Sequence, residues 1–257
     1  MEKLVIGHFY PDLLNLYGDR GNVLALMRRA TLRGIEVEVK RISIGDDVKN
    51  GDIDIGFIGG GQDSEQNIMA DDMKNVKGEV IKQMIEDGVV FLTVCGGYQM
   101  LGQYYEEHDG TRIECLGALP HYTKGEDVRF INDCLYEIEI KGQKIKVAGF
   151  ENHSGRTFLG EGEKPFMKVL KGHGNNGQDG NEGAVYKNTF GTYSHGSLLP
   201  KNPAITDMLL ELALKRKYGE DYVLSELSTE NEDLARKQAI EYIEGKEGKV
   251  PNRDSSL

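Results

Sequence analysis

The stretch from Val89 to Gly102, VVFLTVCGGYQMLG, constrains the fold of this chain more than any other part. Its first six residues form a continuous apolar, β-rich run, which is typical of a parallel strand buried on both faces. Cys95 follows at once, two glycines come next, and the remaining residues have helical spacing. A strand that ends at a nucleophile, turns on glycines and enters a helix is a nucleophile elbow.

The elbow indicates a catalytic role for Cys95. The turn holds the sulfur where a substrate can reach it, and a helix N-terminus lowers the pKa of a thiol and favours the thiolate. A buried structural cysteine is the common alternative. The glycines at 96 and 97 favour catalysis, because a packed cysteine does not need a cleared approach.

Composition sets the broad class. The chain has 257 residues, of which 39% are apolar and 28% charged, as in soluble globular proteins. Its net charge of −11 argues against nucleic acid or an anionic membrane surface as the main partner. The N-terminus does not resemble a signal peptide, and no apolar run approaches the roughly 20 residues of a membrane span. We therefore expect a cytoplasmic protein.

Cysteine usage agrees with a reducing compartment. The three cysteines, Cys95, Cys115 and Cys134, are far apart and odd in number, which fits a cytoplasm better than a disulfide framework. No CxxC or HxxxH pair occurs, so the sequence predicts no zinc site.

Strands alternate with helices before the elbow, which predicts an α/β fold: a mostly parallel sheet with helices on both faces. Residues 103–190 are richer in short β patterns and include a hairpin around residues 141–143. The predicted strands are 4–7, 35–42 and 52–58, and the predicted helices are Asn22 to about Arg33, Met73 to Asp87 and Pro203 to Tyr218.

The chain becomes strongly charged from Gly219 onward. Residues 221–244 keep a helical period of apolar side chains, and the last residues have the composition of a disordered end. We expect residues 1–218 to form one domain and residues 219–257 a C-terminal helical extension. The apolar face of that extension either packs on its own domain or docks on a partner.

A catalytic thiolate needs a group that takes up and returns a proton near neutral pH, and histidine suits this task. His195 is the best candidate, because it lies in a Tyr-Ser-His-Gly-Ser turn just after an apolar strand. Its alternative role is to cap backbone groups of the turn. His153 lies in FENHSGRT, which we interpret as a similar turn at the end of a strand.

Three glycines, at 59, 60 and 61, follow the strand predicted at 52–58. Glycines in such a turn let the backbone approach a ligand and aim N–H groups at it. Beside a thiolate, this favours an oxyanion hole for a tetrahedral intermediate. An ordinary turn between a strand and a helix is the alternative.

Together these motifs carry a resemblance. TVCGGYQMLG, the upstream IGGGQD turn and the downstream TYSHG turn resemble the class I glutamine amidotransferase family. GFENHSGRT is similar to the cobyric acid synthase branch, and the opening YPDLLNLYGDRGN is similar to the GatD-type glutaminase subunits of lipid II isoglutaminyl synthase. The resemblance covers roughly residues 1 to 215.

The resemblance implies roles for single residues. Cys95 would attack the carboxamide of glutamine, and His195 would deprotonate Cys95 and protonate the departing ammonia. The N–H groups of Gly60 and Gly96 would hold the oxyanion.

Two further residues are implied to bind the substrate. Gln99 would help to seat glutamine, and Arg129, in EDVRFIND, would bind the glutamine carboxylate. An arginine suits that position, because its guanidinium forms two parallel hydrogen bonds with a carboxylate.

The resemblance also implies a pathway for the ammonia. Glutamine and water would give glutamate and ammonia through a γ-glutamyl thioester. The ammonia would pass to an ATP-dependent, Mur-ligase-like synthase subunit in a heterodimer, which would amidate the D-glutamate of lipid II. This chain would meet lipid II only through that partner, and it would need no cofactor.

One position departs from the family pattern. Most class I members have a glutamate two residues after the histidine, and Ser197 stands there in this chain. The site either works as a dyad or takes its acid from elsewhere. We hypothesise that an acid of the synthase subunit reaches His195.

Other functions remain open from the residues alone. The chain could be a glutaminase subunit for another acceptor, such as a corrinoid carboxylate. It could be a different cysteine hydrolase, such as a peptidase, which would need no partner. A non-catalytic binding module is a third alternative, against which the intact Cys95, His195 and Gly60 argue.

Overall fold

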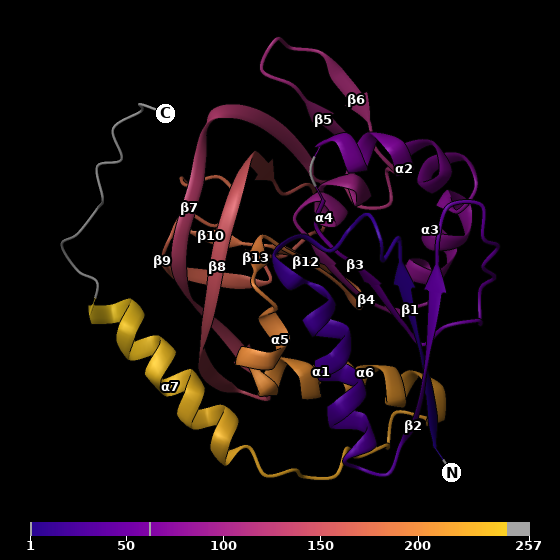
Figure 1. The fold of residues 1–257 in the computed structure, drawn as a ribbon, viewed down its shortest axis with the longest axis vertical. Helices are drawn as coiled ribbons and strands as arrows, with labels where there is room; N and C mark the ends of the chain where they lie inside the picture. Colours follow the sequence, from indigo (N-terminus) through magenta and orange to yellow (C-terminus); the bar gives the residue numbers. More distant parts are fainter. Residues whose placement is uncertain (1, 62, 246–257) are drawn as a thin grey trace.

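A six-stranded, mostly parallel sheet forms the centre of the computed structural model, which describes residues 2–61 and 63–245 (Figure 1). The strand order is β11-β12-β4-β3-β1-β2, and all neighbours run parallel except β11 and β12. The expected α/β class is thereby confirmed. The strands are β1 (Lys3–Phe9), β2 (Glu36–Ile42), β3 (Ile55–Ile58), β4 (Val90–Val94), β11 (Ala184–Tyr186) and β12 (Thr189–Thr192).

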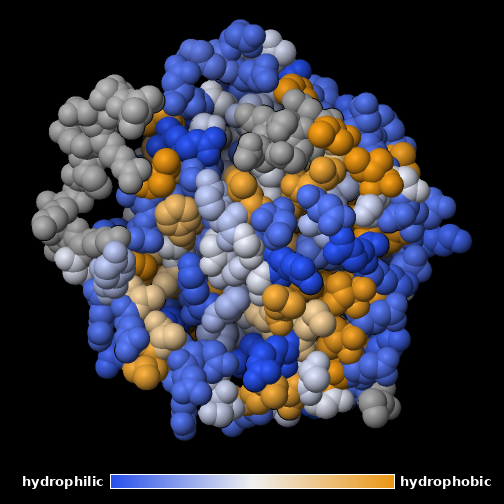
Figure 2. Space-filling view, in the orientation of Figure 1, coloured by the Kyte–Doolittle hydropathy of each residue, from blue (hydrophilic) through white to orange (hydrophobic). Residues whose placement is uncertain are grey.

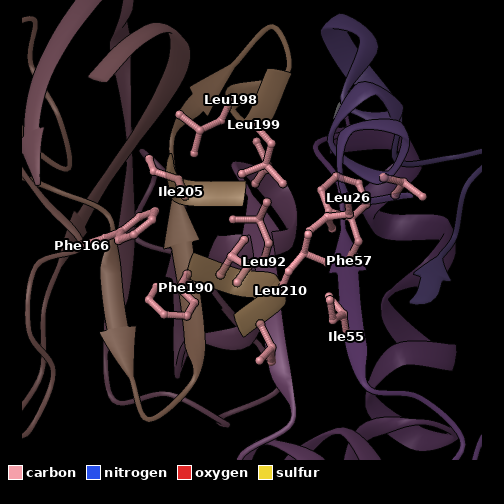
Figure 3. Close-up of a cluster of buried hydrophobic side chains, with 14 of the residues drawn as sticks. Leu26, Ile55, Phe57, Leu92, Phe166, Phe190, Leu198, Leu199, Ile205 and Leu210 are labelled. Carbon is pink, nitrogen blue, oxygen red and sulfur yellow. The ribbon is translucent and has the colours of Figure 1, made fainter. Parts of the chain in front are cut away.

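Helices cover both faces of this sheet. One face carries α1 (Arg20–Thr31), α5 (Leu198–Lys201) and α6 (Pro203–Tyr218), and the other carries α2 (Asp63–Asn75) and α3 (Gly78–Glu86). Strand β4 contributes to both cores, because Leu92 and Val94 pack with the first set of helices and Phe91 with the second. Figure 3 shows side chains of the first core gathered between helices and sheet.

A second, mostly antiparallel sheet lies beside the first (Figure 1). Its two longest strands pair with each other, which confirms the β-rich character expected for residues 103–190 and extends the predicted hairpin. The short β13 pairs with β8, so this sheet reaches the segment that contains His195. The strands are β5 (Tyr104–Glu106), β6 (Arg112–Glu114), β7 (Tyr122–Ile140), β8 (Gln143–Phe158), β9 (Met167–Lys171), β10 (Asn181–Glu182) and β13 (Ser194–His195).

The prediction of one helix from Met73 to Asp87 is wrong, because α2 and α3 are separate helices. A buried ion pair between Lys77 and Asp72 occupies the break. The hydroxyl of Tyr10 also donates to Asp72, at 2.9 Å. A buried amine is tolerated only when it is paired, so the chain turns here to bring Lys77 back to the end of α2.

The first helix also begins earlier than predicted, at Arg20 instead of Asn22. The side chain of Asn22 does not cap its own helix, because its Oδ1 accepts the backbone N–H of Leu199 at 2.9 Å. Asn22 is completely buried in this position. The bond ties the start of α1 to the start of α5, and so to the segment that follows His195.

The charged C-terminal segment forms α7 (Glu230–Gly245), which is shorter than predicted (Figure 1). It contacts β7, β8 and α5, and the buried Ile243 packs on Leu135 and Ala148. Leu234, on the same helix, is 57% exposed. The predicted disordered end beyond residue 245 lies outside the described residues.

The surface mixes residue types. Figure 2 shows hydrophilic and hydrophobic residues interspersed over one face of the molecule. The two longest helices, α6 and α7, have 16 residues each and carry several charged side chains. In the part of the chain that the structure describes, no helix is long and apolar enough to cross a membrane.

The packing of α7 predicts unequal effects of two substitutions. Ile243→Ala should lower the free energy of unfolding by about 1–3 kcal/mol, because it leaves a cavity against Leu135 and Ala148. Leu234→Ala is the matched control on the same helix and should change it by less than about 0.5 kcal/mol. Urea unfolding measures both. Equal effects would show that α7 does not stabilise the domain through Ile243.

Candidate active site

Cys95 lies on the predicted elbow, between the end of β4 and the start of α4 (Gly96–Leu101). Its backbone has φ 47° and ψ −104°, a conformation that a side chain rarely adopts and that marks a functional turn. Two hydrogen bonds hold the turn: the Cys95 N–H donates to the Thr192 carbonyl at 2.8 Å, and its carbonyl accepts the Gln99 N–H at 2.9 Å.

The second glycine of the elbow is required by packing. A Cβ atom on Gly97 would lie 2.7 Å from the Ile58 carbonyl oxygen and 2.8 Å from that of Gly59. The glycine therefore lets α4 start directly against the end of β3, and the elbow meets the turn at 59–61.

Three side chains converge on Gly60. A Cβ atom at this position would lie 2.7 Å from His195 Cε1, 3.2 Å from Asp19 Oδ2 and 3.4 Å from Cys95 Cβ. His195 comes from β13 and Cys95 from the elbow, so the structure brings the two predicted catalytic residues together. Both side chains are buried, His195 completely.

Asp19 is the acidic residue of this group, and sequence reasoning missed it. Its Oδ2 lies 3.4 Å from His195 Nδ1, within ion-pair distance, and the side chain is completely buried. An acid of this chain therefore lies beside His195, and the hypothesis that an acid of the synthase subunit reaches this histidine stays a prediction. The signal available in the sequence was a carboxylate in a glycine-flanked turn, YGDRG, directly before a helix.

The charges around His195 favour its protonated form. Burial alone would lower its pKa, but the interactions with Cys95 and Asp19 outweigh burial and raise the pKa to about 10. Among the described residues, neither ring nitrogen has a hydrogen-bond partner. A buried imidazolium beside a thiolate can protonate a leaving group, and its nitrogens remain available for that task.

The two predicted oxyanion donors differ in availability. The N–H of Gly60 donates to Asp19 Oδ2 at 2.9 Å, so it is occupied in this structure. The N–H of Gly96 begins α4, and no hydrogen bond within the described ranges uses it. It lies directly after Cys95, where the positive end of a helix favours a developing negative charge.

Arg129 is exposed on β7 and belongs to a chain of contacts that ends at His195. Its guanidinium donates to Asn152 Oδ1 at 2.9 Å, and the Asn152 amide donates to the Tyr17 hydroxyl. The Tyr17 ring lies edge-on to the His195 ring, with the ring centres 5.1 Å apart. A positive charge is therefore available at the rim of the site.

Gln99 lies on the inner side of α4 and is nearly buried. Its amide nitrogen donates to the Tyr193 hydroxyl at 3.0 Å, and that hydroxyl also contacts Thr157 Oγ1 at 2.7 Å. The Tyr193 ring stacks on His153 with the ring centres 3.7 Å apart. These contacts fix the side chain of Gln99 close to the elbow.

His153 is not in a turn at the end of a strand, as the sequence suggested, but inside β8. Its Nδ1 contacts the Gly155 carbonyl at 2.7 Å, and burial lowers its pKa to about 3. The histidine is therefore neutral at physiological pH. It supports Tyr193 instead of serving as a second base.

The other two cysteines lie in surroundings that suppress reactivity. Burial raises the pKa of Cys115 to about 11, and it raises that of Cys134 further. Within residues 2–61 and 63–245, no three His, Cys, Asp or Glu side chains are grouped so that they could hold a metal ion.

Comparison with known proteins agrees with this geometry. The profile of the CobB/CobQ-like glutamine amidotransferase domain matches residues 5–203. The chain is 44% identical to the protein named lipid II isoglutaminyl synthase (glutamine-hydrolyzing) subunit GatD of Streptococcus pneumoniae, over 95% of this chain and 92% of that protein. It is also 44% identical to the subunit of the same name from Staphylococcus aureus, over 94% and 96% of the two chains.

More distant relatives share parts of the chain or the fold alone. A probable cobyric acid synthase of Methanocaldococcus jannaschii is 33% identical over 56% of this chain and 31% of its own length. The PurLQS structure from Thermotoga maritima has a TM-score of 0.54 at 16% identity, covering 76% of this chain and 88% of that one. With its elbow, its histidine and this range of relatives, the chain belongs to the CobB/CobQ-like family of glutamine amidotransferases.

Proposed function

We propose that this chain hydrolyses L-glutamine to glutamate and ammonia through a γ-glutamyl thioester on Cys95. We further propose that it delivers the ammonia to an ATP-dependent, Mur-ligase-like synthase subunit, which amidates the D-glutamate of lipid II in the cytoplasm. The observation that carries the first proposal is the convergence of Cys95, His195 and Asp19 over Gly60 at a strained elbow.

The first half of the reaction forms the thioester. The Cys95 thiolate attacks the carboxamide carbon of glutamine, and the carbonyl oxygen takes up negative charge next to the Gly96 N–H. The carbon–nitrogen bond then breaks, and the His195 imidazolium gives its proton to the departing nitrogen, which leaves as ammonia. His195 is neutral at the end of this half.

The second half restores the site. Neutral His195 takes a proton from water, and the hydroxide formed attacks the thioester carbon. The carbon–sulfur bond breaks, glutamate leaves, and the thiolate–imidazolium pair returns. Water and glutamine are consumed and glutamate and ammonia are released, so no other reactant is needed.

Two positions support a preference for free glutamine. Arg129 offers a guanidinium at the rim of the site, where it suits the α-carboxylate of an amino acid. Gln99 is held near the elbow by Tyr193, where its amide can contact the bound substrate. A peptidase that cleaves internal peptide bonds would not need a fixed positive charge for a free carboxylate.

The acceptor and the partner rest on the relatives. The two proteins that are 44% identical to this chain are named as subunits of lipid II isoglutaminyl synthase, and the match spans nearly the whole of each. The cobyric acid synthase match spans a third of that protein or less, which leaves a corrinoid acceptor as the weaker candidate. Purifying the native complex identifies the partner and decides between the two acceptors.

Substitution of the nucleophile tests the reaction. Cys95→Ser should reduce the kcat for glutamine hydrolysis by about 10⁴-fold or more, because the thioester cannot form. Cys115→Ser is the control and should leave kcat within about twofold. A chloroketone analogue of glutamine should label Cys95 and spare Cys115 and Cys134. Ammonia release by Cys95→Ser at the unsubstituted rate would refute the assignment.

The role of Arg129 predicts a defect in binding. Arg129→Ala should raise the KM for glutamine about 10- to 100-fold with a smaller effect on kcat, because a charged contact to the carboxylate is lost. Arg129→Lys should recover only part of it, since lysine cannot form the two parallel bonds. Arg112→Ala removes another exposed guanidinium and should leave KM unchanged. Steady-state kinetics at low glutamine separates these outcomes.

A further inference from the structure

We infer that Arg156 is a positioning residue for glutamine binding, because it clamps the segment of β7 that presents Arg129. The substrate and the role of Arg129 in this inference rest on the proposed function. The clamp itself rests on contacts among β7, β8 and the loop between β9 and β10.

Strands β7 and β8 lie side by side, and their pairing is interrupted by a large bulge (Figure 1). The pairing passes from Gly125 to Phe130 on β7 while β8 advances by only two residues, so residues 126–129 lie opposite Ser154 alone. We call these four residues the bulge, and all of them are exposed. A bulge re-aims side chains but leaves its backbone groups without partners in the sheet. Other contacts must therefore set its position.

Arg156 of β8 holds the bulge through a backbone group. Its guanidinium donates to the Val128 carbonyl at 2.5 Å, and also to the carbonyls of Ser154 at 3.1 Å and Gly155 at 3.4 Å. Arg156 is only 7% exposed, and burial lowers its pKa from the ordinary value. A buried guanidinium is costly unless its N–H groups are hydrogen-bonded, and here the backbone of the bulge supplies one of the acceptors.

The same guanidinium covers one face of the Phe130 ring, which comes directly after the bulge. Its central carbon lies 3.3 Å from the ring centre. The His173 ring stacks on Phe130 with 3.9 Å between the ring centres and 10° between the planes. Two groups so close to the ring centre cannot share one face, so Phe130 lies between Arg156 and His173. A cation over an aromatic ring is held more strongly when both are shielded from water.

His173 is itself held by a buried carboxylate. Glu151 is completely buried, accepts the backbone N–H groups of His173 and Gly174 at 3.1 Å each, and contacts the His173 Nδ1 at 2.6 Å. The loop then meets the edge of the Phe130 ring at Gly177, where a Cβ atom would lie 2.8 Å from Phe130 Cζ. The loop between β9 and β10 is therefore a fixed support for one face of Phe130.

The bulge borders a cavity of about 230 Å³. The cavity lining combines residues of β7 with residues of α4 and of the β5–β6 hairpin, among them Met100, Tyr105, Ile113, Glu126 and Asp127. Packing beside this cavity leaves room for the bulge to shift, and an exposed segment with few packed contacts opens easily. The contacts of Arg156 and Phe130 therefore decide where the bulge lies.

The clamp fixes Arg129 from both sides along the chain. Arg156 holds the carbonyl of the residue before Arg129, and it covers the ring of the residue after it, Phe130. The Arg129 side chain then reaches Asn152 Oδ1 at the rim of the active site. An arginine that is already held in place loses less conformational entropy when it binds a carboxylate. Arg156 therefore acts on glutamine through Arg129.

Exchanging Arg156 for lysine tests the inference. Arg156→Lys keeps the positive charge but loses the planar fork that bonds the bulge and covers Phe130. With the synthase subunit bound, the KM for glutamine should rise about 5- to 20-fold while kcat stays within about threefold. Arg112→Lys is the matched control and should leave KM unchanged, because Arg112 lies over the Tyr104 ring at 4.3 Å and bonds Glu106 instead of the bulge.

A double-substitution cycle shows whether Arg156 acts through Arg129. In the Arg129→Ala background the contact to the carboxylate is already lost, so adding Arg156→Lys should change KM by less than about twofold. Effects of the two substitutions that multiply would show that Arg156 acts independently of Arg129, and they would overturn the inference.

A second readout needs no glutamine. The chain contains no tryptophan, so Val128→Trp places a single fluorophore on the bulge, at a residue that is 68% exposed. The fluorescence anisotropy of this reporter should fall when Arg156→Lys is added, because the bulge then moves more freely. Phe130→Leu removes the stacked ring and should lower the anisotropy as well, whereas Arg112→Lys should not. Circular dichroism checks that each variant is folded.

The outcomes separate the inference from the proposed function. Unchanged anisotropy in Arg156→Lys and in Phe130→Leu would overturn the clamp, and lower anisotropy with an unchanged KM would overturn its role in glutamine binding. If Arg156→Lys does not fold, Phe130→Leu decides by the same two measurements. If the unsubstituted chain, alone and with its synthase subunit, releases no ammonia, the proposed function fails. The anisotropy still decides whether Arg156 holds the bulge in that case.

Discussion

The active site depends on the close approach of three side chains to the backbone of Gly60. Any side chain at this position would overlap His195 and press on Asp19 and Cys95. Because Gly60 lacks one, a nucleophile from the elbow, a base from β13 and an acid from the start of α1 meet around one peptide unit. The N–H of that unit also anchors the acid.

The two sheets divide the work of building this site. The parallel sheet supplies rigid strand ends: β3 leads into the glycine turn and β4 into Cys95, and both strands are completely buried. The antiparallel sheet supplies the rest, because β8 pairs with β13 and contributes Asn152 beside Arg129. Packing in the parallel sheet therefore fixes the position of Cys95. The second sheet positions His195 and the residues at the rim of the site.

Local patterns made the elbow, His195 and α6 predictable from sequence. Each is encoded within a short stretch of sequence. The elbow is an apolar strand followed by Cys-Gly-Gly, and His195 lies in a turn after a strand. Helix α6 has a helical period of apolar residues that begins at a proline. The failures have a different physical origin. Asp19 lies far from His195 along the chain, and only the fold brings them together. The break between α2 and α3 likewise follows from a buried ion pair with Tyr10 beside it, which no helical period reveals.

The central claim is that Cys95 carries the acyl group of glutamine during turnover. Its most direct test is to mix the chain and its synthase subunit with isotope-labelled glutamine, quench in acid within one turnover, and map the label by mass spectrometry. The account predicts a γ-glutamyl thioester on Cys95 and on no other residue, which disappears when the glutamine is consumed. Ammonia release without any acyl adduct on Cys95, or with an adduct on another residue, would contradict it.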